Sequence, residues 1–202
     1  MKLHVTPGSP NCRKIEAALK FYGHDIEIVS LDIFSGTHKT PEYIALNPNG
    51  KLPILEDGSL VLWESNAILN HLFADQSQEP AQRAEILRWQ FWEAAHYGKA
   101  VGTLVWERFA KPKFGLGAKD AAAEQSAMDA FHQLAPVLSA QLSSRAFVLG
   151  DTPSIADFAL ASQAAYLDAA DIPYRDYPDL TAWYDRLDSI PAWHATRPDF
   201  GG

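Results

Sequence analysis

Residues 47–65 read NPNGKLPILEDGSLVLWES, and this stretch decides the fold more than any other part of the chain. Its first four residues, 47–50, are turn formers that end the helical pattern before them. Two short apolar runs follow at 53–56 and 60–62, and the Asp-Gly-Ser triplet at 57–59 between them is typical of a β-hairpin. Helical periodicity begins again at Ser65, the last residue of the stretch. The stretch therefore predicts two antiparallel strands followed by a helix.

The residues before this stretch alternate between strand and helix signals. Ser9 and Pro10 predict a helix start, because serine suits an N-cap and proline suits the first helical position. Gly23 suits the other end of that helix. We expect strands at 3–5, 26–31, 53–56 and 60–62, and helices at 10–22, 40–46 and 65–73. The order is thus β-α-β-α-β-β-α.

The rest of the chain has helical periodicity throughout. A polar linker at 74–80 precedes a long expected helix at 81–109, which proline and glycine break at 111–117. Further helices are expected at 128–142, despite Pro136, from Ser154 to about 170, and at 180–187. Ser154 and Asp157 resemble a capping box. We therefore predict an α+β protein of two domains, a mixed domain at 1–74 and an all-α domain at 81–202.

Composition limits the classes of function. The 202 residues carry 17 basic and 25 acidic side chains, a net charge of −8, which argues against nucleic acid and anionic membranes as partners. No apolar run is long enough to span a membrane, and residues 1–7 lack a secretory signal, so we expect a cytoplasmic protein. Cys12 is the single cysteine, which excludes an internal disulfide and a cysteine-based zinc site. No metal site is expected.

Two expected helix starts carry serine. Ser9 and Ser65 each lie where a helix N-terminus presents free N–H groups and a partial positive charge, which favour an anion. Either serine could equally be a simple cap. Glu64 is placed to complement the helix dipole or to receive a ligand ammonium.

A second group surrounds the proline that opens the hairpin. If the peptide bond between Leu52 and Pro53 is cis, the backbone N–H and C=O of Leu52 are exposed and can pair with an extended peptide. An ordinary trans turn is the alternative, and cis bonds are found at only about 5–6% of X–Pro positions. His38, Lys39 and Lys51 are close in sequence and form either a cationic spot or solvated surface.

Taken together, these segments resemble the glutathione transferase family. The segments SPNCRK (9–14), GTHKTPEYIALNPNGKLPILED (36–57), LWESNAIL (62–69) and PSIADFAL (153–160) stand in the family's order and spacing. The resemblance is closer to serine-type bacterial and theta- or delta-like members than to tyrosine-type ones. It implies a thioredoxin-like N-terminal domain that binds glutathione and an all-helical domain that supplies the second substrate's pocket.

The resemblance also implies a role for each matching residue. Ser9 would donate its hydroxyl to the glutathione sulfur, with Asn11 close enough to assist. The remaining residues would bind glutathione: His38, Lys39 and Lys51 at the glycine carboxylate, Leu52 before a cis Pro53 at the cysteinyl backbone, and Glu64 and Ser65 at the γ-glutamyl end. Glutathione is a co-substrate in this scheme, and no cofactor is expected.

The long helix carries aromatic candidates for the second pocket. Trp92, His96, Trp106 and Phe109 would suit a small, flat hydrophobic electrophile, although each could equally belong to a helix core or a dimer contact. A peroxide or a disulfide is an alternative acceptor for the thiolate. The resemblance further implies a homodimer and a role in detoxification.

Two other functions stay open from the sequence. A glutathione-dependent thiol–disulfide enzyme would work through Cys12, although Cys12 shares an apolar face with Ile15 and Leu19, which favours a buried structural thiol. A non-catalytic protein that keeps the fold would turn nothing over. No tyrosine lies at the end of the first strand, which excludes the tyrosine mechanism.

Overall fold

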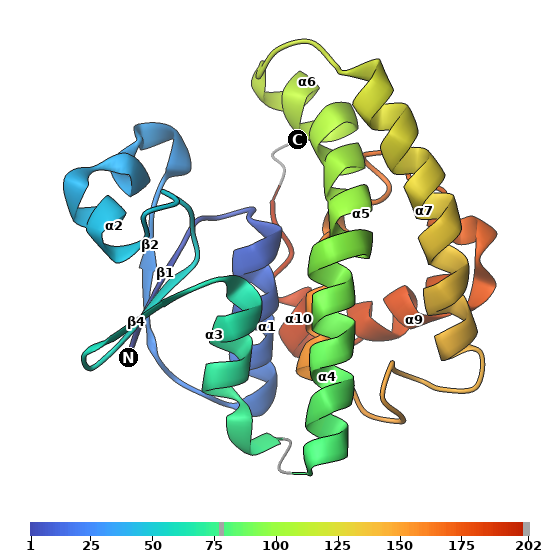
Figure 1. The fold of residues 1–202 in the computed structure, drawn as a ribbon, viewed down its shortest axis with the longest axis horizontal. Helices are drawn as coiled ribbons and strands as arrows, with labels where there is room; N and C mark the ends of the chain where they lie inside the picture. The colour runs from blue at the N-terminus through green and yellow to red at the C-terminus, as the bar shows by residue number, and fades with distance from the viewer. Residues whose placement is uncertain (77–78, 200–202) are drawn as a thin grey trace. The chain divides into compact units, whose positions relative to one another are not determined.

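A computed structural model describes residues 1–76 and 79–199. The chain forms two compact units, which are described separately. The first contains the residues up to 78 together with the segment that begins at Pro191, and the second is Glu79–Ile190. In Figure 1 the first unit is coloured blue to teal with its red terminal segment, and the second runs from green to orange.

The first unit is built on a four-stranded sheet of order β2-β1-β3-β4. The strands are β1 (Lys2–Val5), β2 (Glu27–Ser30), β3 (Ile54–Asp57) and β4 (Leu60–Trp63). β1 pairs parallel with β2 and antiparallel with β3, and β3 pairs antiparallel with β4. Leu3 faces Ile28 on one side and Leu55 on the other, and both Leu3 and Leu55 are fully buried. The predicted hairpin is confirmed, with Gly58 at φ 59° in its turn.

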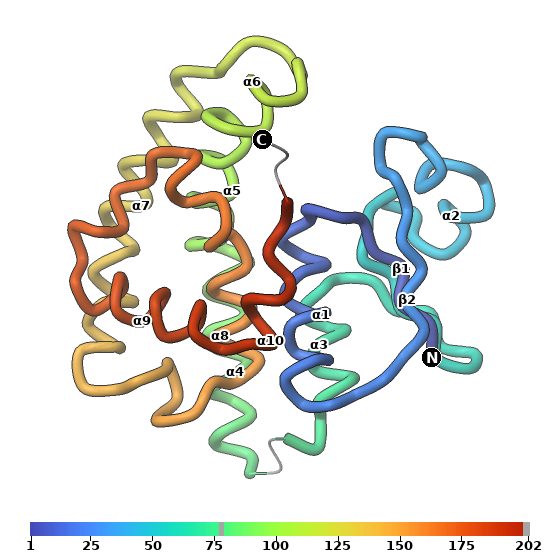
Figure 2. The backbone as a smooth tube through the Cα atoms, turned by 180° about the vertical axis from the view of Figure 1, so that it is seen from behind, coloured from blue at the N-terminus to red at the C-terminus, as the bar shows by residue number. Residues whose placement is uncertain are grey.

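Helices lie on both faces of this sheet. α1 (Pro10–Tyr22) and α3 (Ser65–Leu72) pack together on one face, and α2 (Pro41–Leu46) lies on the other (Figures 1 and 2). Short 3-10 segments lie at Ile33–Ser35, Thr37–Lys39 and Ala74–Gln76. The predicted strand and helix order of this unit is therefore confirmed. α10 (Pro191–His194) packs on α1, where the Arg13 guanidinium lies 3.9 Å from the ring centre of Trp193.

The second unit is helical. Its first helix continues from α4 (Pro80–Trp92) through α5 (Gly98–Val105) to α6 (Lys111–Phe114), with π-helical turns between them at Glu93–Tyr97 and Trp106–Ala110. α7 (Ala121–Leu142), α8 (Ile155–Leu160) and α9 (Pro178–Asp188) follow, with 3-10 segments at Ala164–Tyr166 and Tyr174–Asp176. Figure 1 shows α4 and α5 as one green column beside the yellow α7.

A buried carboxylate organises the interior of this unit. Asp157 is fully buried, and its oxygens accept hydrogen bonds from the Ser154 N–H and hydroxyl, the Val148 N–H and the Trp183 indole at 2.8–3.0 Å. The predicted capping box is thereby confirmed. Burial raises the pKa of Asp157 more than these four donors lower it.

Three predicted helix limits were wrong. The helix expected at 128–142 begins at Ala121, because the Asp120 carboxylate caps it by accepting from the Ala122 and Ala123 N–H groups. The long helix does not stop at 109–111: the chain stays helical through the π turn and Pro112 to Phe114, and it ends at Gly115, where glycine readily adopts the left-handed conformation at φ 64°. The helix that begins after Ser154 ends at Leu160 rather than near 170, and turns and a 3-10 segment follow. Within the described residues, no helix is long and apolar enough to cross a membrane.

Candidate active site

The N-terminus of α1 carries the first candidate, Ser9. It is the N-cap of the helix, with extended backbone (φ −74°, ψ 122°), and its Oγ accepts a hydrogen bond from the Cys12 N–H at 3.4 Å. A hydroxyl that accepts at its lone pair still has its own hydrogen to donate. Ser9 is half-buried, so this donor lies near the surface at the positive end of the helix.

Cys12, one turn further along α1, has a different environment. Its side chain is fully buried, and Sγ accepts a hydrogen bond from the Thr6 N–H at 3.5 Å. Burial raises the pKa of the Cys12 thiol to about 11, although the Ser9 hydroxyl and the Thr6 N–H offset part of the rise. The predicted burial of Cys12 is confirmed, and a buried, protonated thiol does not favour the thiol–disulfide alternative.

Asn11 and Ser65 connect the N-termini of α1 and α3. The Ser65 hydroxyl donates to Asn11 Oδ1 at 3.2 Å, and Ser65 itself is 8% exposed. Three residues further along α1 and one residue further along α3, the Lys14 ammonium donates to Asn66 Oδ1 at 2.8 Å. Lys14 is only 1% exposed, so a buried cation lies close to both helix starts. This corner of the unit is electropositive and suits an anionic group.

The backbone next to this corner is unusual at two of the predicted positions. The Leu52–Pro53 peptide bond is cis, as predicted, and Glu64 has a φ of 73°, which is rare outside glycine. The turn before Leu52 is fixed by Asn47, whose Nδ2 donates to the Lys51 carbonyl at 2.8 Å and whose Oδ1 accepts from the Asn49 N–H at 3.0 Å. Among the described residues, neither the N–H nor the C=O of Leu52 has a hydrogen-bond partner.

The three cationic candidates differ in exposure. Lys39 and Lys51 are exposed, whereas His38 is 7% exposed and its Nδ1 has no hydrogen-bond partner in the described part of the chain. A Cβ atom on Gly50 would lie 3.8 Å from both the His38 carbonyl and Lys39 Cγ, so the segments that carry the two lysines touch. Nothing in the residues around His38 predicts that its side chain is buried.

The four aromatic candidates of the second unit are grouped around its π-helical turns. Trp92 precedes the first turn and stacks on Tyr97, with ring centres 5.4 Å apart, whereas His96 within that turn is exposed. Trp106 and Phe109 both lie in the second turn. Trp106 is 46% exposed, and the Phe109 ring centre is 5.4 Å from that of Tyr166. Sequence periodicity missed both π turns, because they differ from an α-helix by one residue each.

Sequence reasoning also missed Lys14 and Asn66. A lysine within a helical pattern normally predicts a solvated side chain, and only the folded position of α3 reveals its partner. Within the described residues, no group of three or more metal-ligating side chains comes together.

Comparison with known proteins gives the family. Residues 1–74 match the sequence profile described as "Glutathione S-transferase, N-terminal domain", and residues 91–186 match "Glutathione S-transferase, C-terminal domain". Glutathione S-transferase 3 of Zea mays is 31% identical over 208 residues, which cover 97% of this chain and 92% of the relative.

Solved structures agree with the sequence matches. A glutathione S-transferase from Pseudomonas fluorescens is 34% identical with a TM-score of 0.81, over 95% of this chain and 96% of that one. Glutathione S-transferase-I, solved with lactoylglutathione bound, is 27% identical with a TM-score of 0.85, over 97% of each chain. The chain therefore belongs to the glutathione S-transferase family, which confirms the predicted fold and the predicted glutathione transferase activity.

Proposed function

We propose that this chain is a serine-type glutathione transferase, of the bacterial theta- or delta-like kind, in which the Ser9 hydroxyl stabilises the glutathione thiolate. The observation that carries this proposal is the contrast between Ser9 and Cys12. Ser9 holds a hydroxyl at the half-buried N-cap of α1, whereas Cys12 is fully buried with a pKa of about 11. This contrast supports Ser9, and not Cys12, as the residue that acts on a sulfur from outside the chain.

Glutathione has an anionic group at each end, and two electropositive regions of the first unit match them. The γ-glutamyl end would meet Glu64 and Ser65 at the start of α3, beside Asn11 and above the Lys14–Asn66 pair. The cysteinyl backbone would pair with the N–H and C=O of Leu52, which precedes the cis Pro53. The glycine carboxylate would be held by His38, Lys39 and Lys51. The unpartnered Nδ1 of His38 supports this assignment.

The proposed contacts are large enough to activate the thiol. An unperturbed thiol with a pKa of about 8.5 is only about 3% thiolate at pH 7, and a two-unit drop in pKa requires about 2.7 kcal/mol. One hydrogen bond to a charged group contributes about 1.5–3 kcal/mol, and the helix N-terminus about 0.3–1 kcal/mol. Ser9 and α1 together are sufficient. Ser9 acts as a donor and not as a base, so the thiol proton leaves to solvent.

The thiolate then attacks an electrophilic carbon, a new C–S bond forms, and the leaving group departs with its electron pair. We assign residues 1–74 to glutathione binding and residues 81–202 to the second substrate. Trp92, His96, Trp106 and Phe109 are the proposed lining of that pocket. Their aromatic character favours a small hydrophobic electrophile, with a hydroperoxide as the other acceptor class. A cytoplasmic homodimer that acts in detoxification completes the proposal.

The test combines binding and turnover on the purified chain. Glutathione at about 100 times its dissociation constant stabilises a protein by about 2.7 kcal/mol, which raises Tm by about 5–11 °C for a chain of this size. Turnover is then measured with a panel of aromatic halides, activated alkenes and hydroperoxides. A thermal shift without turnover of any acceptor would favour a non-catalytic binding protein, and no shift at all would remove the glutathione site.

A further inference from the structure

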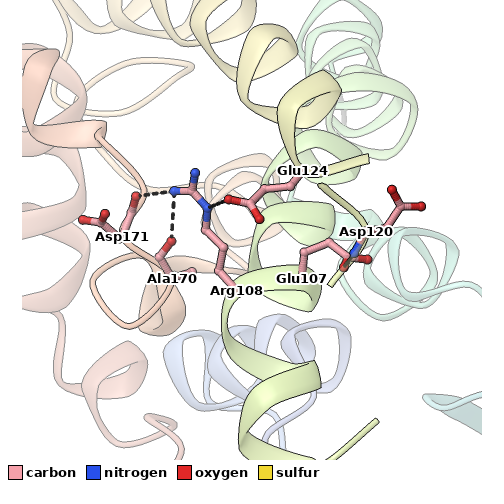
Figure 3. Close-up of polar contacts among 6 residues, drawn as sticks. All are labelled: Glu107, Arg108, Asp120, Glu124, Ala170 and Asp171. Carbon is pink, nitrogen blue, oxygen red and sulfur yellow. Dashed lines mark hydrogen bonds and ion pairs between the residues drawn. The ribbon is translucent and has the colours of Figure 1, made fainter. Parts of the chain in front are cut away.

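The π-helical turn at Trp106–Ala110 carries two of the proposed pocket residues, Trp106 and Phe109. π turns inside α-helices are rare and are frequent at functional sites. A conformation this rare needs side-chain contacts that favour it over a regular helix. The two residues between Trp106 and Phe109, Glu107 and Arg108, provide such contacts in two different directions (Figure 3).

Glu107 fixes the turn to the start of α7. Its side chain is 4% exposed, and Oε2 accepts hydrogen bonds from Lys111 Nζ and from the Asp120 N–H, each at 2.7 Å. Asp120 is the N-cap of α7. The Lys111 ammonium and then the Asp120 N–H lower the pKa of Glu107, so this anchor is ionised at neutral pH.

Arg108 fixes the turn to two other segments at once. Its Nε donates to Glu124 Oε1 in the first turn of α7 at 2.7 Å. Its Nη1 donates to the carbonyl oxygens of Asp171 at 2.8 Å and Ala170 at 3.4 Å, as the dashed lines of Figure 3 mark. Asp171 has a φ of 49°, an uncommon conformation for a residue with a side chain, and its carbonyl is one of the groups that Arg108 holds.

The next residue along the turn contacts the same segment. The centres of the Phe109 and Tyr166 rings are 5.4 Å apart, and the Ala170 N–H donates to the Tyr166 carbonyl at 2.9 Å. Two neighbouring residues of the turn therefore contact opposite ends of residues 166–171: Phe109 makes an aromatic contact at the first end, and Arg108 makes polar contacts at the last.

We propose that Arg108 is a positioning residue for the second-substrate pocket, because it holds residues 166–171 so that the Phe109–Tyr166 ring pair keeps its shape. The inference rests on the proposed assignment of Phe109 to that pocket. The planar guanidinium is essential, since it reaches a carboxylate with one nitrogen and two carbonyls with another. A lysine at this position keeps the charge but cannot span both sets of acceptors.

The test compares Arg108→Lys with Arg88→Lys. Arg88 is a matched control, because it is exposed and pairs with Glu85 on α4, away from the turn. Steady-state kinetics with glutathione and chlorodinitrobenzene should show that Arg108→Lys raises KM for the electrophile about tenfold, the ratio that corresponds to about 1.4 kcal/mol. KM for glutathione should stay within about twofold, and Arg88→Lys should change neither.

Two further measurements distinguish a positioning role of Arg108 from a purely structural one. Dissociation constants for anilinonaphthalene sulfonate, an aromatic probe, should rise in parallel with the electrophile KM and do not depend on turnover. Glu124→Gln, which removes the charge of one partner, should give a milder change in the same direction. A lower Tm with unchanged electrophile KM, or an equal rise in both KM values, would show that Arg108 serves stability alone and would overturn the inference.

Phe109→Ala separates this inference from the proposed function. If Phe109→Ala raises the electrophile KM and Arg108→Lys does not, Arg108 has no positioning role and the pocket assignment stands. If neither variant changes the electrophile KM or the probe's dissociation constant, the pocket lies elsewhere, and both the assignment of Phe109 and the role of Arg108 are wrong.

Discussion

Replacing Ser9 with alanine removes two hydrogen bonds, one that caps α1 and one proposed to reach the glutathione thiolate, and they differ in the free energy that they contribute. The N-cap bond to the Cys12 N–H is long, at 3.4 Å, so its loss should cost about 0.5 kcal/mol, the low end for a cap, and lower Tm by about 1–2 °C. The proposed bond to the glutathione thiolate is charge-assisted and contributes about 1.5–3 kcal/mol. Ser9→Ala should therefore reduce kcat/KM by about 10- to 160-fold while the protein remains folded.

The pH dependence of kcat/KM tests whether Ser9 acts by stabilising the thiolate. Because the lost donor stabilises the thiolate, the pKa of the bound thiol should rise by about one to two units in Ser9→Ala. The rising limb of the pH–rate profile should move to higher pH by the same amount, and the variant should approach the wild-type rate at the alkaline end. Stopped-flow titration of thiolate absorbance in the glutathione complex measures the same pKa directly.

Ser9→Thr is the matched control, because threonine keeps a hydroxyl that can both cap the helix and donate to sulfur. Ser9→Thr should keep most of the wild-type kcat/KM, and the rising limb of its pH–rate profile should stay at the wild-type pH. Asn11→Ala tests the other candidate donor, whose Oδ1 is occupied by the Ser65 hydroxyl. A Ser9→Ala variant with an unshifted pH limb, or a large shift in Asn11→Ala alone, would refute the serine mechanism.

Three further outcomes are expected. Lys51→Ala should raise KM for glutathione several-fold with little change in kcat, whereas Lys113→Ala, an exposed lysine of the second unit, should change neither; a lower kcat at constant KM would contradict the carboxylate contact. Cys12, with its thiol buried and its pKa about 11, should resist iodoacetamide at pH 8 until urea unfolds the chain, as mass spectrometry can check. Asp157→Ala leaves four donors without an acceptor and should cost about 3–5 kcal/mol in urea unfolding, a result that an unchanged midpoint would disprove.

Features set by neighbours in the chain could be predicted from the sequence. As predicted, Ser9 caps the start of α1, Gly23 caps its end, and the Ser154 capping box forms. These features could be predicted because caps depend on residues only a few positions apart. The burial of Cys12 was predictable as well, from its spacing to Ile15 and Leu19. Such signals were enough to give the order of strands and helices in the first unit.

Features set by distant contacts could not be predicted in this way. The Asn11–Ser65 bond joins residues 54 positions apart, and nothing near either residue indicates it. Glu107 and Arg108 of the π turn at Trp106–Ala110 bond to Asp120, Glu124 and the 166–171 segment, and none of these contacts is visible in the local apolar pattern, which predicts an ordinary helix.

The contrast between Ser9 and Cys12 also explains why the sulfur of this reaction comes from the substrate. Cys12 lies in the first turn of α1, where the helix N-terminus favours a thiolate by about 0.3–1 kcal/mol. Burial nevertheless raises its pKa to about 11, which is the opposite direction, so burial outweighs the helix. A thiol can use the same helix only if it stays outside the core and receives a direct donor. In our proposal glutathione meets both conditions at Ser9, and Cys12 meets neither.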